Sequence, residues 1–111
     1  MILFSKPSIT KKELKFVNQA LNKKILTDGF FQKKAESVIK KKINSNFIAL
    51  TQSCTDALEM AVSLIQLKPN DEVIKPSYTF TSTANAVVLR GAKPVFVDIK
   101  PDSLQIDYEK I

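Results

Sequence analysis

The sequence predicts an α/β fold, a parallel-strand α/β/α sandwich, and three observations indicate it. Three short strand-like runs, 47–50, 72–75 and 94–98, are spaced along the second half of the chain. A segment with helical periodicity separates each run from the next. Strands that alternate with helices form a parallel sheet, because a parallel connection has to cross over the sheet.

Two helices are expected before the first strand. Thr10 and Glu13 have the spacing of a capping box, which predicts that a helix begins there. The segment 26–29 contains Asp-Gly and is a turn signal. A second helix is expected from about Gln32 to Ile43, with a lysine-rich outer face.

The first strand is expected to be buried and to lead into the longest apolar-periodic segment. The turn between them, 52–55, consists of small and polar residues, and the helix after it ends before Pro69. The second strand, 72–75, is stopped by Pro76 because proline cannot donate to the ladder.

The last elements complete the alternation. A helix rich in small residues is expected over 82–90, with Gly91 at its C′ position, and the third strand follows at 94–98. Asp107 is expected to cap a helix at the chain end. Three strands are few for such a sheet. The chain is therefore expected to be the N-terminal part of a larger protein, with a helical segment at 1–46 and the start of a large α/β domain at 47–111.

Composition narrows the possible functions. The 111 residues carry a net charge of +6, but nearly all the excess is lysine and Arg90 is the only arginine, which disfavours nucleic-acid binding. There is no histidine and one cysteine, Cys54, which excludes Ser-His-Asp catalysis, an internal disulfide and a multi-cysteine metal site. No apolar run is long enough to span a bilayer, and no signal peptide is recognisable, so a cytoplasmic protein with no metal and no membrane partner is expected.

Two loops follow strands at the edge where ligands bind in open α/β sheets. In the turn 52–55, free backbone N–H groups and the Ser53 and Thr55 hydroxyls can bind a phosphate or carboxylate; in the alternative interpretation, Ser53 or Thr55 only caps the helix. In the loop 76–85, Tyr78 and Phe80 can offer a flat face to a planar ligand, or simply pack beneath the sheet edge. The residues alone leave both pairs of alternatives open.

Several stretches of the chain together match one pattern. They are Phe4-Ser5-Lys6-Pro7, Leu26-x-x-Gly29, Ser53-Cys54-Thr55-x-Ala57-Leu58-Glu59-Met60-Ala61, 71–86 and 90–102. These stretches resemble the N-terminal part of the large domain of the DegT/StrS-type sugar-nucleotide aminotransferases, which are pyridoxal-phosphate enzymes with the aspartate-aminotransferase fold (fold type I). The residues at 53–55 and 78–80 are most similar to those of the branch that aminates dTDP-4-keto-6-deoxyglucose in enterobacterial common antigen synthesis.

The resemblance implies roles for individual residues. The cofactor would be pyridoxal 5′-phosphate, with its phosphate on the turn at Ser53, Cys54 and Thr55 and its ring against Phe80. Cys54 would be a small structural residue, since no basic neighbour in the sequence activates its thiol. The loop containing Thr27 and Gly29 would lie near the sugar nucleotide at the interface of a homodimer.

The resemblance also implies what the chain lacks. The lysine that carries the cofactor and the aspartate that pairs with its ring nitrogen would lie beyond Ile111, so no catalytic residue is assigned and the 111 residues alone are predicted to be inactive. Lys75 is interpreted as solvated.

The complete enzyme is expected to transfer an amino group from L-glutamate to the C4 ketone of a dTDP-4-keto-6-deoxyhexose, for cell-surface polysaccharide. The alternatives are another nucleotide-sugar aminotransferase, a dehydratase of the same family, or an inactive truncated remnant.

Overall fold

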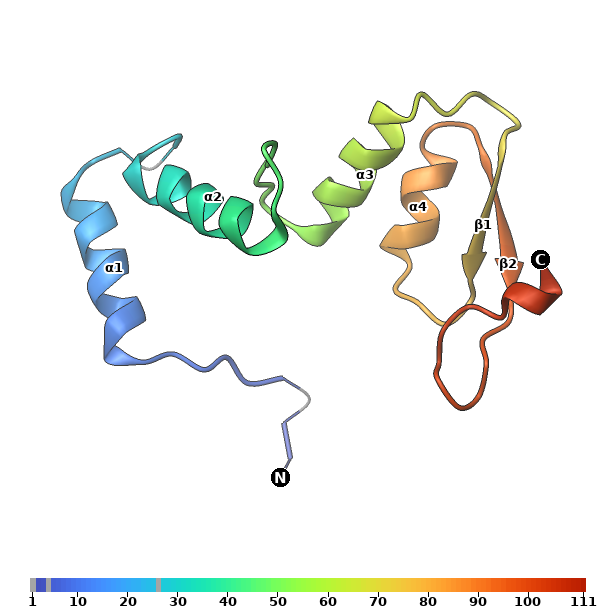
Figure 1. Ribbon diagram of the computed structural model, residues 1–111, viewed down its shortest axis with the longest axis horizontal. Coiled ribbons are helices and arrows are strands. Elements are labelled where there is room, and N and C mark those ends of the chain that lie inside the picture. Colours follow the sequence, from blue (N-terminus) through green and yellow to red (C-terminus); the bar gives the residue numbers. More distant parts are fainter. Residues whose placement is uncertain (1, 4, 26) are drawn as a thin grey trace. The chain divides into compact units, whose positions relative to one another are not determined.

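The computed structural model of the chain describes residues 2–3, 5–25 and 27–111 (Figure 1). The chain divides into two units, 1–50 and 51–111. The first unit contains helices α1 (Lys11–Asn22) and α2 (Phe30–Ile43). The second contains helix α3 (Cys54–Leu64), strand β1 (Glu72–Pro76), helix α4 (Ser82–Val88), strand β2 (Lys93–Val97) and a final 3₁₀ turn, η1 (Tyr108–Lys110). In the described part of the chain, no helix is long and apolar enough to cross a membrane.

Helix α1 begins where the sequence predicts. The Thr10 side chain accepts a hydrogen bond from the backbone N–H of Lys12 at 3.2 Å, and the Glu13 carboxylate accepts from the backbone N–H of Thr10 at 2.7 Å. The capping box predicted from the sequence is therefore confirmed. The hydrogen bond from the Thr10 hydroxyl, together with those from the backbone N–H groups of Glu13 and Thr10, lowers the pKa of Glu13 below its ordinary value.

Aromatic side chains join α1 and α2 within the first unit. The ring of Phe16 on α1 meets the ring of Phe31 on α2 edge-on, with centroids 6.0 Å apart. The Lys34 ammonium lies 5.2 Å from the centroid of the Phe16 ring. Helix α2 ends at Asn44, whose left-handed backbone (φ 52°) is typical of a helix stop.

The predicted strand at 47–50 is not formed, and this prediction is wrong. The segment has no strand pairing, and Phe47 is 90% exposed. An apolar run becomes a strand only when a neighbouring strand takes up its N–H and C=O groups. In the part of the chain that the structure describes, the sheet contains only β1 and β2.

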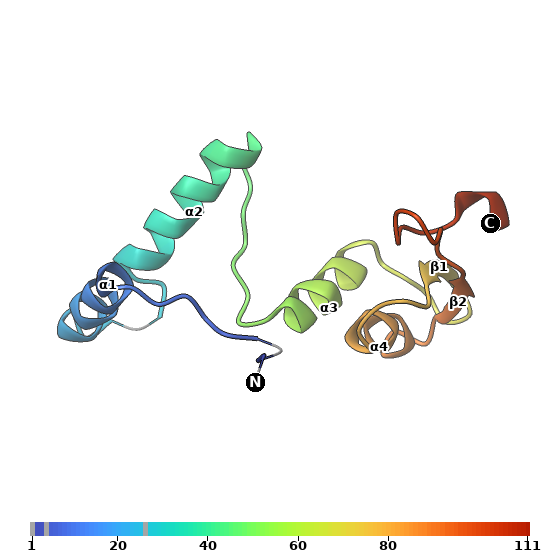
Figure 2. The same ribbon diagram turned by 90° about the horizontal axis from the view of Figure 1, so that it is seen from below.

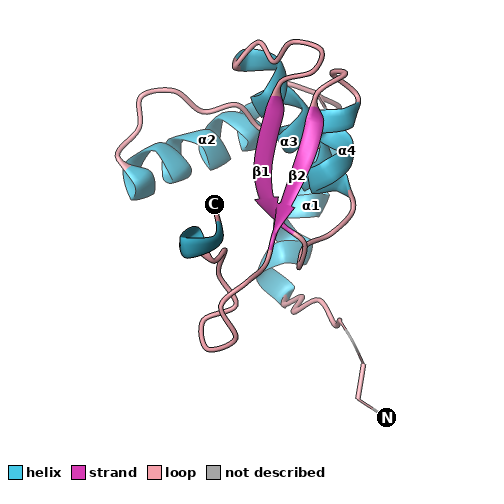
Figure 3. Ribbon diagram, turned by 90° about the vertical axis from the view of Figure 1, so that its right-hand side faces the viewer, coloured by secondary structure: helices cyan, strands magenta, loops and turns pink. Residues whose placement is uncertain are grey.

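Strands β1 and β2 pair in parallel, as predicted, with α4 connecting them. The register places Val73 opposite Pro94 and Lys75 opposite Phe96, so these four residues share one face of the sheet. The buried apolar residues of the unit come from α4, from the turn after it and from β2, and they are Ala86, Val87, Ala92 and Val97. Figure 3 shows the two strands side by side.

Helix α4 packs against β2, and α3 packs on α4 (Figure 2). In Figure 1 the arrowheads of β1 and β2 point to the end of the unit at which α3 and α4 begin. This arrangement is a consequence of parallel strands joined by helices, and it brings strand C-termini and helix N-termini to one edge. Both predicted site loops lie at this edge.

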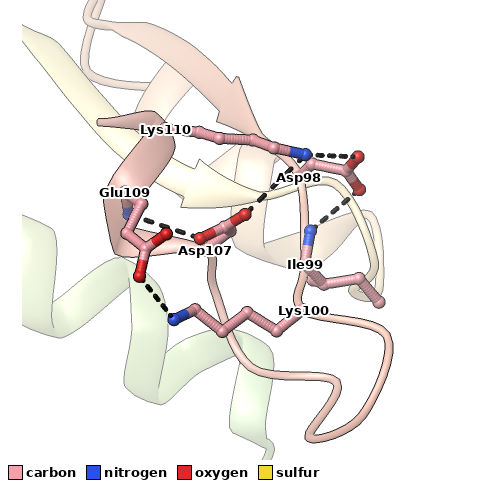
Figure 4. Close-up of polar contacts among 6 residues, drawn as sticks. All are labelled: Asp98, Ile99, Lys100, Asp107, Glu109 and Lys110. Atoms are coloured by element: carbon pink, nitrogen blue, oxygen red, sulfur yellow. Dashed lines mark hydrogen bonds and ion pairs between the residues drawn. The ribbon is translucent and has the colours of Figure 1, made fainter.

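The segment after β2 folds back through polar contacts around Asp98 (Figure 4). The Asp98 carboxylate accepts a hydrogen bond of 2.8 Å from the backbone N–H of Ile99 and one of 3.3 Å from the Lys110 ammonium. The Ile99 backbone N–H is the largest single cause of the lowered pKa of Asp98, followed by the hydrogen bond and the charge of Lys110. Asp107 caps η1 by accepting from the backbone N–H of Glu109, so its predicted capping role is confirmed.

Candidate functional site

The turn before α3 is held by two side-chain hydrogen bonds. The Ser53 hydroxyl accepts from the backbone N–H of Asp56 at 3.1 Å, which makes Ser53 the N-cap of α3. The Thr51 hydroxyl donates to the Ser53 carbonyl at 2.8 Å. Ser53 therefore has the cap role that was one of the two alternatives for this turn.

The cap does not exclude an anion site. Accepting from Asp56 uses an oxygen lone pair of Ser53 and leaves its hydroxyl hydrogen available to a ligand. The backbone N–H groups of Cys54 and Thr55, the first two helical residues, have no carbonyl one turn earlier to bond. The positive end of the helix dipole adds to these donors, so the turn can hold an anion while it caps the helix.

The side chains around this turn differ in exposure. Cys54 is a free, exposed cysteine, and Thr55 is half-buried. Asp56 is exposed, and its carboxylate in the first turn suits the helix dipole. In the described part of the chain, no cluster of histidine, cysteine, aspartate and glutamate could hold a metal ion.

The loop after β1 presents both of its aromatic rings to solvent. Tyr78 is 68% exposed and Phe80 is 76% exposed, so neither ring is packed beneath the sheet edge in the described part of the chain. The loop itself is tied down, because the Ser77 backbone N–H donates to the Val97 carbonyl at 3.2 Å. The Thr79 and Thr83 hydroxyls hydrogen-bond to each other at 3.0 Å. An anchored loop with an open aromatic face is suited to a planar ligand.

A pocket of about 280 Å³ lies beside Phe80 at the end of β1. Four loop residues line it, together with two residues of α4 and one residue from each strand. The loop residues are Ser77, Thr79, Phe80 and Thr81, without Tyr78. The residues of the Ser53 turn do not line this pocket. The structure thus brings the two predicted loops to one edge of the unit, with Phe80 in the pocket wall and Ser53, Cys54 and Thr55 outside it.

The interpretation of Lys75 as a solvated lysine is wrong. Lys75 is only 5% exposed, and its ammonium lies 4.9 Å from the centroid of the Phe96 ring. The residue belongs to the pocket wall. The strand pattern carried a signal for this, because Lys75 shares its face with the apolar Val73.

The loop between α1 and α2 belongs to the first unit. Gly29 is the N-cap of α2 and lines a cavity of about 390 Å³, together with Phe30 and Phe31. Thr27 is exposed and is not part of that cavity wall. Two residues of the motifs described above, Phe4 and Leu26, lie outside the described residues. The assignment of Thr27 and Gly29 to a sugar-nucleotide site stays a prediction.

Comparison with known proteins identifies the chain. Residues 7–111 match the DegT/DnrJ/EryC1/StrS aminotransferase family. The chain belongs to this family. The Bacillus subtilis 3-oxo-glucose-6-phosphate:glutamate aminotransferase is 36% identical over 77% of the chain and 19% of its own length.

Solved structures agree with this family assignment and show the fold. The putative sugar aminotransferase Spr1654 from Streptococcus pneumoniae, in its pyridoxamine-phosphate (PMP) form, superposes with a TM-score of 0.89 and 33% identity, over 98% of this chain and 28% of that one. An Escherichia coli GDP-4-keto-6-deoxy-D-mannose-3-dehydratase with bound hydrated pyridoxal phosphate gives 0.84 and 28% identity, over 95% and 28%. The predicted fold, the N-terminal part of the fold type I large domain, is therefore confirmed.

These comparisons cover only part of each related protein. The chain spans 19% to 28% of the length of the curated relatives it matches. Pyridoxal phosphate or its amino form is named in several of the matching structures, which agrees with the predicted cofactor. The names of these relatives include an aminotransferase of a sugar phosphate and a dehydratase of a GDP-sugar.

Proposed function

We propose that the protein is the N-terminal part of a pyridoxal-phosphate-dependent sugar aminotransferase. The complete enzyme would take an amino group from L-glutamate and deliver it to the C4 ketone of a dTDP-4-keto-6-deoxyhexose. L-Glutamate becomes 2-oxoglutarate as the ketone becomes an amine, and bound pyridoxal phosphate carries the amino group between them. The observation that supports this most directly is the family match over residues 7–111.

Four residues of this chain are proposed to hold the cofactor. The Ser53 hydroxyl and the backbone N–H groups of Cys54 and Thr55 would bind its phosphate, because they are free donors at a helix N-terminus. Phe80 would lie against its ring, since it is exposed and stands on a loop anchored to β2. The same proposal divides the chain into a helical segment at 1–46 and the start of the large domain at 47–111. It also includes a contact of Thr27 and Gly29 with the sugar nucleotide.

The assembly is proposed as a cytoplasmic homodimer that acts in cell-surface polysaccharide synthesis. The 111 residues alone would be inactive, because the proposed lysine and aspartate partners of the cofactor are not among them. The name of a second Bacillus subtilis relative, the spore coat polysaccharide biosynthesis protein SpsC, supports the polysaccharide assignment.

The test of the substrate uses the complete enzyme of the proposal. Purified enzyme is incubated with L-glutamate and, in separate reactions, with the dTDP-, GDP- and UDP-linked 4-keto-6-deoxyhexoses. We expect a 4-amino sugar from the dTDP substrate, identified by NMR of the product, and 2-oxoglutarate in equal amount. A 3-deoxy product without a sugar amine would support a dehydratase, the alternative that the Escherichia coli structure favours. An open reading frame that stops naturally at Ile111 would support an inactive remnant.

The test of the cofactor site compares two aromatic residues of similar exposure. Phe80→Leu should weaken pyridoxal-phosphate binding by about fivefold, because a stacked aromatic pair contributes on the order of 1 kcal/mol beyond its burial. Tyr78→Leu is the matched control, since Tyr78 is 68% and Phe80 76% exposed on the same loop. Affinity is read from the cofactor absorbance during titration. Equal losses in the two variants would refute the assignment of the ring contact to Phe80.

A further inference from the structure

The loop that carries Phe80 is held by backbone hydrogen bonds on both sides of this residue. The Phe80 carbonyl accepts from the backbone N–H of Thr83 in the first turn of α4, at 3.1 Å. On the other side, the Thr79 backbone N–H donates to the Ser77 carbonyl at 3.0 Å, which closes a three-residue turn. The backbone at Phe80 is therefore connected both to α4 and to the end of β1.

Thr83 makes two separate contacts with this loop. Its backbone N–H donates to the Phe80 carbonyl, and its hydroxyl hydrogen-bonds with the Thr79 hydroxyl at 3.0 Å. Any residue except proline can supply the backbone donor, but the second contact needs a polar side chain at position 83. One residue of α4 thus holds both Phe80 and the residue before it.

Packing does little to fix the direction of the Phe80 ring. The side chain is 76% exposed, and none of the aromatic pairs in the described part of the chain includes it. The direction of the ring therefore depends on the backbone of the loop. A loop that samples several conformations loses this freedom when a ligand binds, and the loss lowers the affinity. A hydrogen bond that orders the loop beforehand reduces the loss.

We propose that Thr83 is a positioning residue for the ring of Phe80. Through its hydrogen bond with the Thr79 hydroxyl, Thr83 holds the loop, before the cofactor binds, in the conformation in which the ring can lie against it. Thr83 does not line the pocket beside Phe80, so it acts through the loop. The inference rests on the proposed function, from which it takes the contact between Phe80 and the cofactor ring.

The hydrogen bond between the two hydroxyls also has a simpler interpretation, which is stabilisation of the start of α4. The N-cap residue of α4, Thr81, makes no side-chain capping bond, so a second side-chain contact here would strengthen the helix. A stabilising role alone predicts a lower free energy of unfolding and an unchanged affinity of the folded protein for pyridoxal phosphate. A positioning role predicts a lower affinity, and only while Phe80 is present.

The test titrates the complete enzyme, prepared without cofactor, with pyridoxal phosphate and follows the cofactor absorbance, while urea denaturation measures stability. Thr83→Val keeps the branched shape and removes the hydroxyl, so the affinity should fall about threefold, as expected for loss of one neutral hydrogen bond. Thr83→Ser keeps a hydroxyl and should restore the affinity. Thr81→Val is the matched control, because Thr81 is exposed and makes no capping bond. Unchanged affinity in Thr83→Val, or an equal loss in Thr81→Val, would overturn the proposal.

A double variant shows whether Thr83 acts through the ring. In the Phe80→Leu background, Thr83→Val should cause no further loss of affinity, because no ring is left to position. An equal loss in both backgrounds would overturn the positioning role. If Phe80→Leu alone binds the cofactor normally, the proposed ring contact and this inference both fail. If Phe80→Leu weakens binding and Thr83→Val does not, this inference alone fails.

Thr79→Val covers the case in which Thr83→Val does not fold. Thr79 is exposed and lies outside α4, so its substitution leaves the helix sequence intact and removes the same hydrogen bond. The affinity for pyridoxal phosphate should fall by the factor expected for Thr83→Val. Normal cofactor binding by folded Thr79→Val would also overturn the proposal.

Discussion

The Ser53 hydroxyl accepts a hydrogen bond of 3.1 Å from the backbone N–H of Asp56, and this contact fixes where α3 begins. It also determines which donors at the turn stay free. The cap satisfies the N–H of the third helical residue and leaves those of Cys54 and Thr55 for a ligand. The same serine can therefore have a structural role and, under the proposed function, a cofactor-binding role.

The two roles of Ser53 can be separated by substitution. Ser53→Ala should lower the free energy of unfolding by about 0.5–2 kcal/mol, because the cap acceptor is lost. Ser53→Asp keeps a cap acceptor and adds a charge that suits the helix dipole, so stability should be retained within about 0.5 kcal/mol. Urea denaturation measures both effects.

Ligand binding should respond differently from stability in this pair. Ser53→Asp places a negative charge where the phosphate is proposed to bind, so the affinity for pyridoxal phosphate should fall although the fold is intact. A Ser53→Asp variant that binds the cofactor as well as the unmodified protein would refute the assignment of the phosphate to this turn. Ser53→Thr, which keeps the hydroxyl, is the control for both measurements.

Asp98 gives a prediction for the dependence of stability on pH. Its folded-state pKa lies below its ordinary value, chiefly because of the Ile99 backbone N–H and secondarily because of Lys110. A lowered folded-state pKa means that the ionised form favours folding. The resulting stabilisation is fully present above the unfolded-state pKa of about 3.9 and is lost as the pH falls through the folded-state value.

Substitutions should remove this dependence in a defined order. Asp98→Asn should flatten the decline of the melting temperature below about pH 4. Lys110→Met should remove only part of the decline, because the hydrogen bond from the Ile99 backbone N–H remains. Glu72→Gln is the control, since Glu72 is exposed and its carboxylate forms no ion pair in the described part of the chain. A larger effect from Lys110→Met than from Asp98→Asn would contradict this order.

Local signals in the sequence predicted the features that depend on few neighbouring residues. Thr10 and Glu13 marked the start of α1, and Asp107 marked the cap of η1. Gly91 marked the turn after α4, where the backbone has a positive φ of 75°. Each of these conformations is decided within about one helical turn of the chain, so the sequence contains nearly all the information.

The features that depend on distant residues were predicted less well. Phe47 lies in a run that reads as a strand, but a strand needs a partner and the described part of the chain supplies none to it. Lys75 reads as a solvated residue because of its side-chain type, but its environment is set by the register with Phe96 and by the helix above. Of the site residues, the sequence located Phe80 on its strand-end loop but gave no sign of the pocket beside it.

The capping box of α1 provides a prediction for the first unit. Thr10→Ala should lower the free energy of unfolding by about 1 kcal/mol and reduce the helix signal in circular dichroism, because the acceptor for the Lys12 backbone N–H is lost. Thr10→Ser and Glu13→Gln should retain most of the helix, since both residue types are found in this motif. If Thr10→Ala were as stable as Thr10→Ser, the capping box would contribute nothing to the free energy of unfolding.

Gly91 allows backbone strain to be distinguished from crowding. A Cβ on Gly91 would lie 3.5 Å from three atoms of Pro69, which is ordinary van der Waals contact, so there is space for a methyl group. The positive φ of 75° is the obstacle, because a left-handed backbone costs an L-residue about 1–2 kcal/mol. Gly91→Ala should destabilise the protein by this amount, measured by urea denaturation.

Gly91→Asn should cost less than Gly91→Ala, although its side chain is larger, because asparagine tolerates the left-handed region. The order of the two variants in free energy of unfolding therefore shows why substitution of Gly91 is destabilising. If Gly91→Asn is the less stable variant, the cause is crowding against Pro69 and not the backbone angle. The hydrogen bond of 3.0 Å from the Asn70 backbone N–H to the Gly91 carbonyl ties this turn to the start of β1. The backbone amides of β1 should therefore exchange their hydrogens faster in Gly91→Ala than in the unmodified protein.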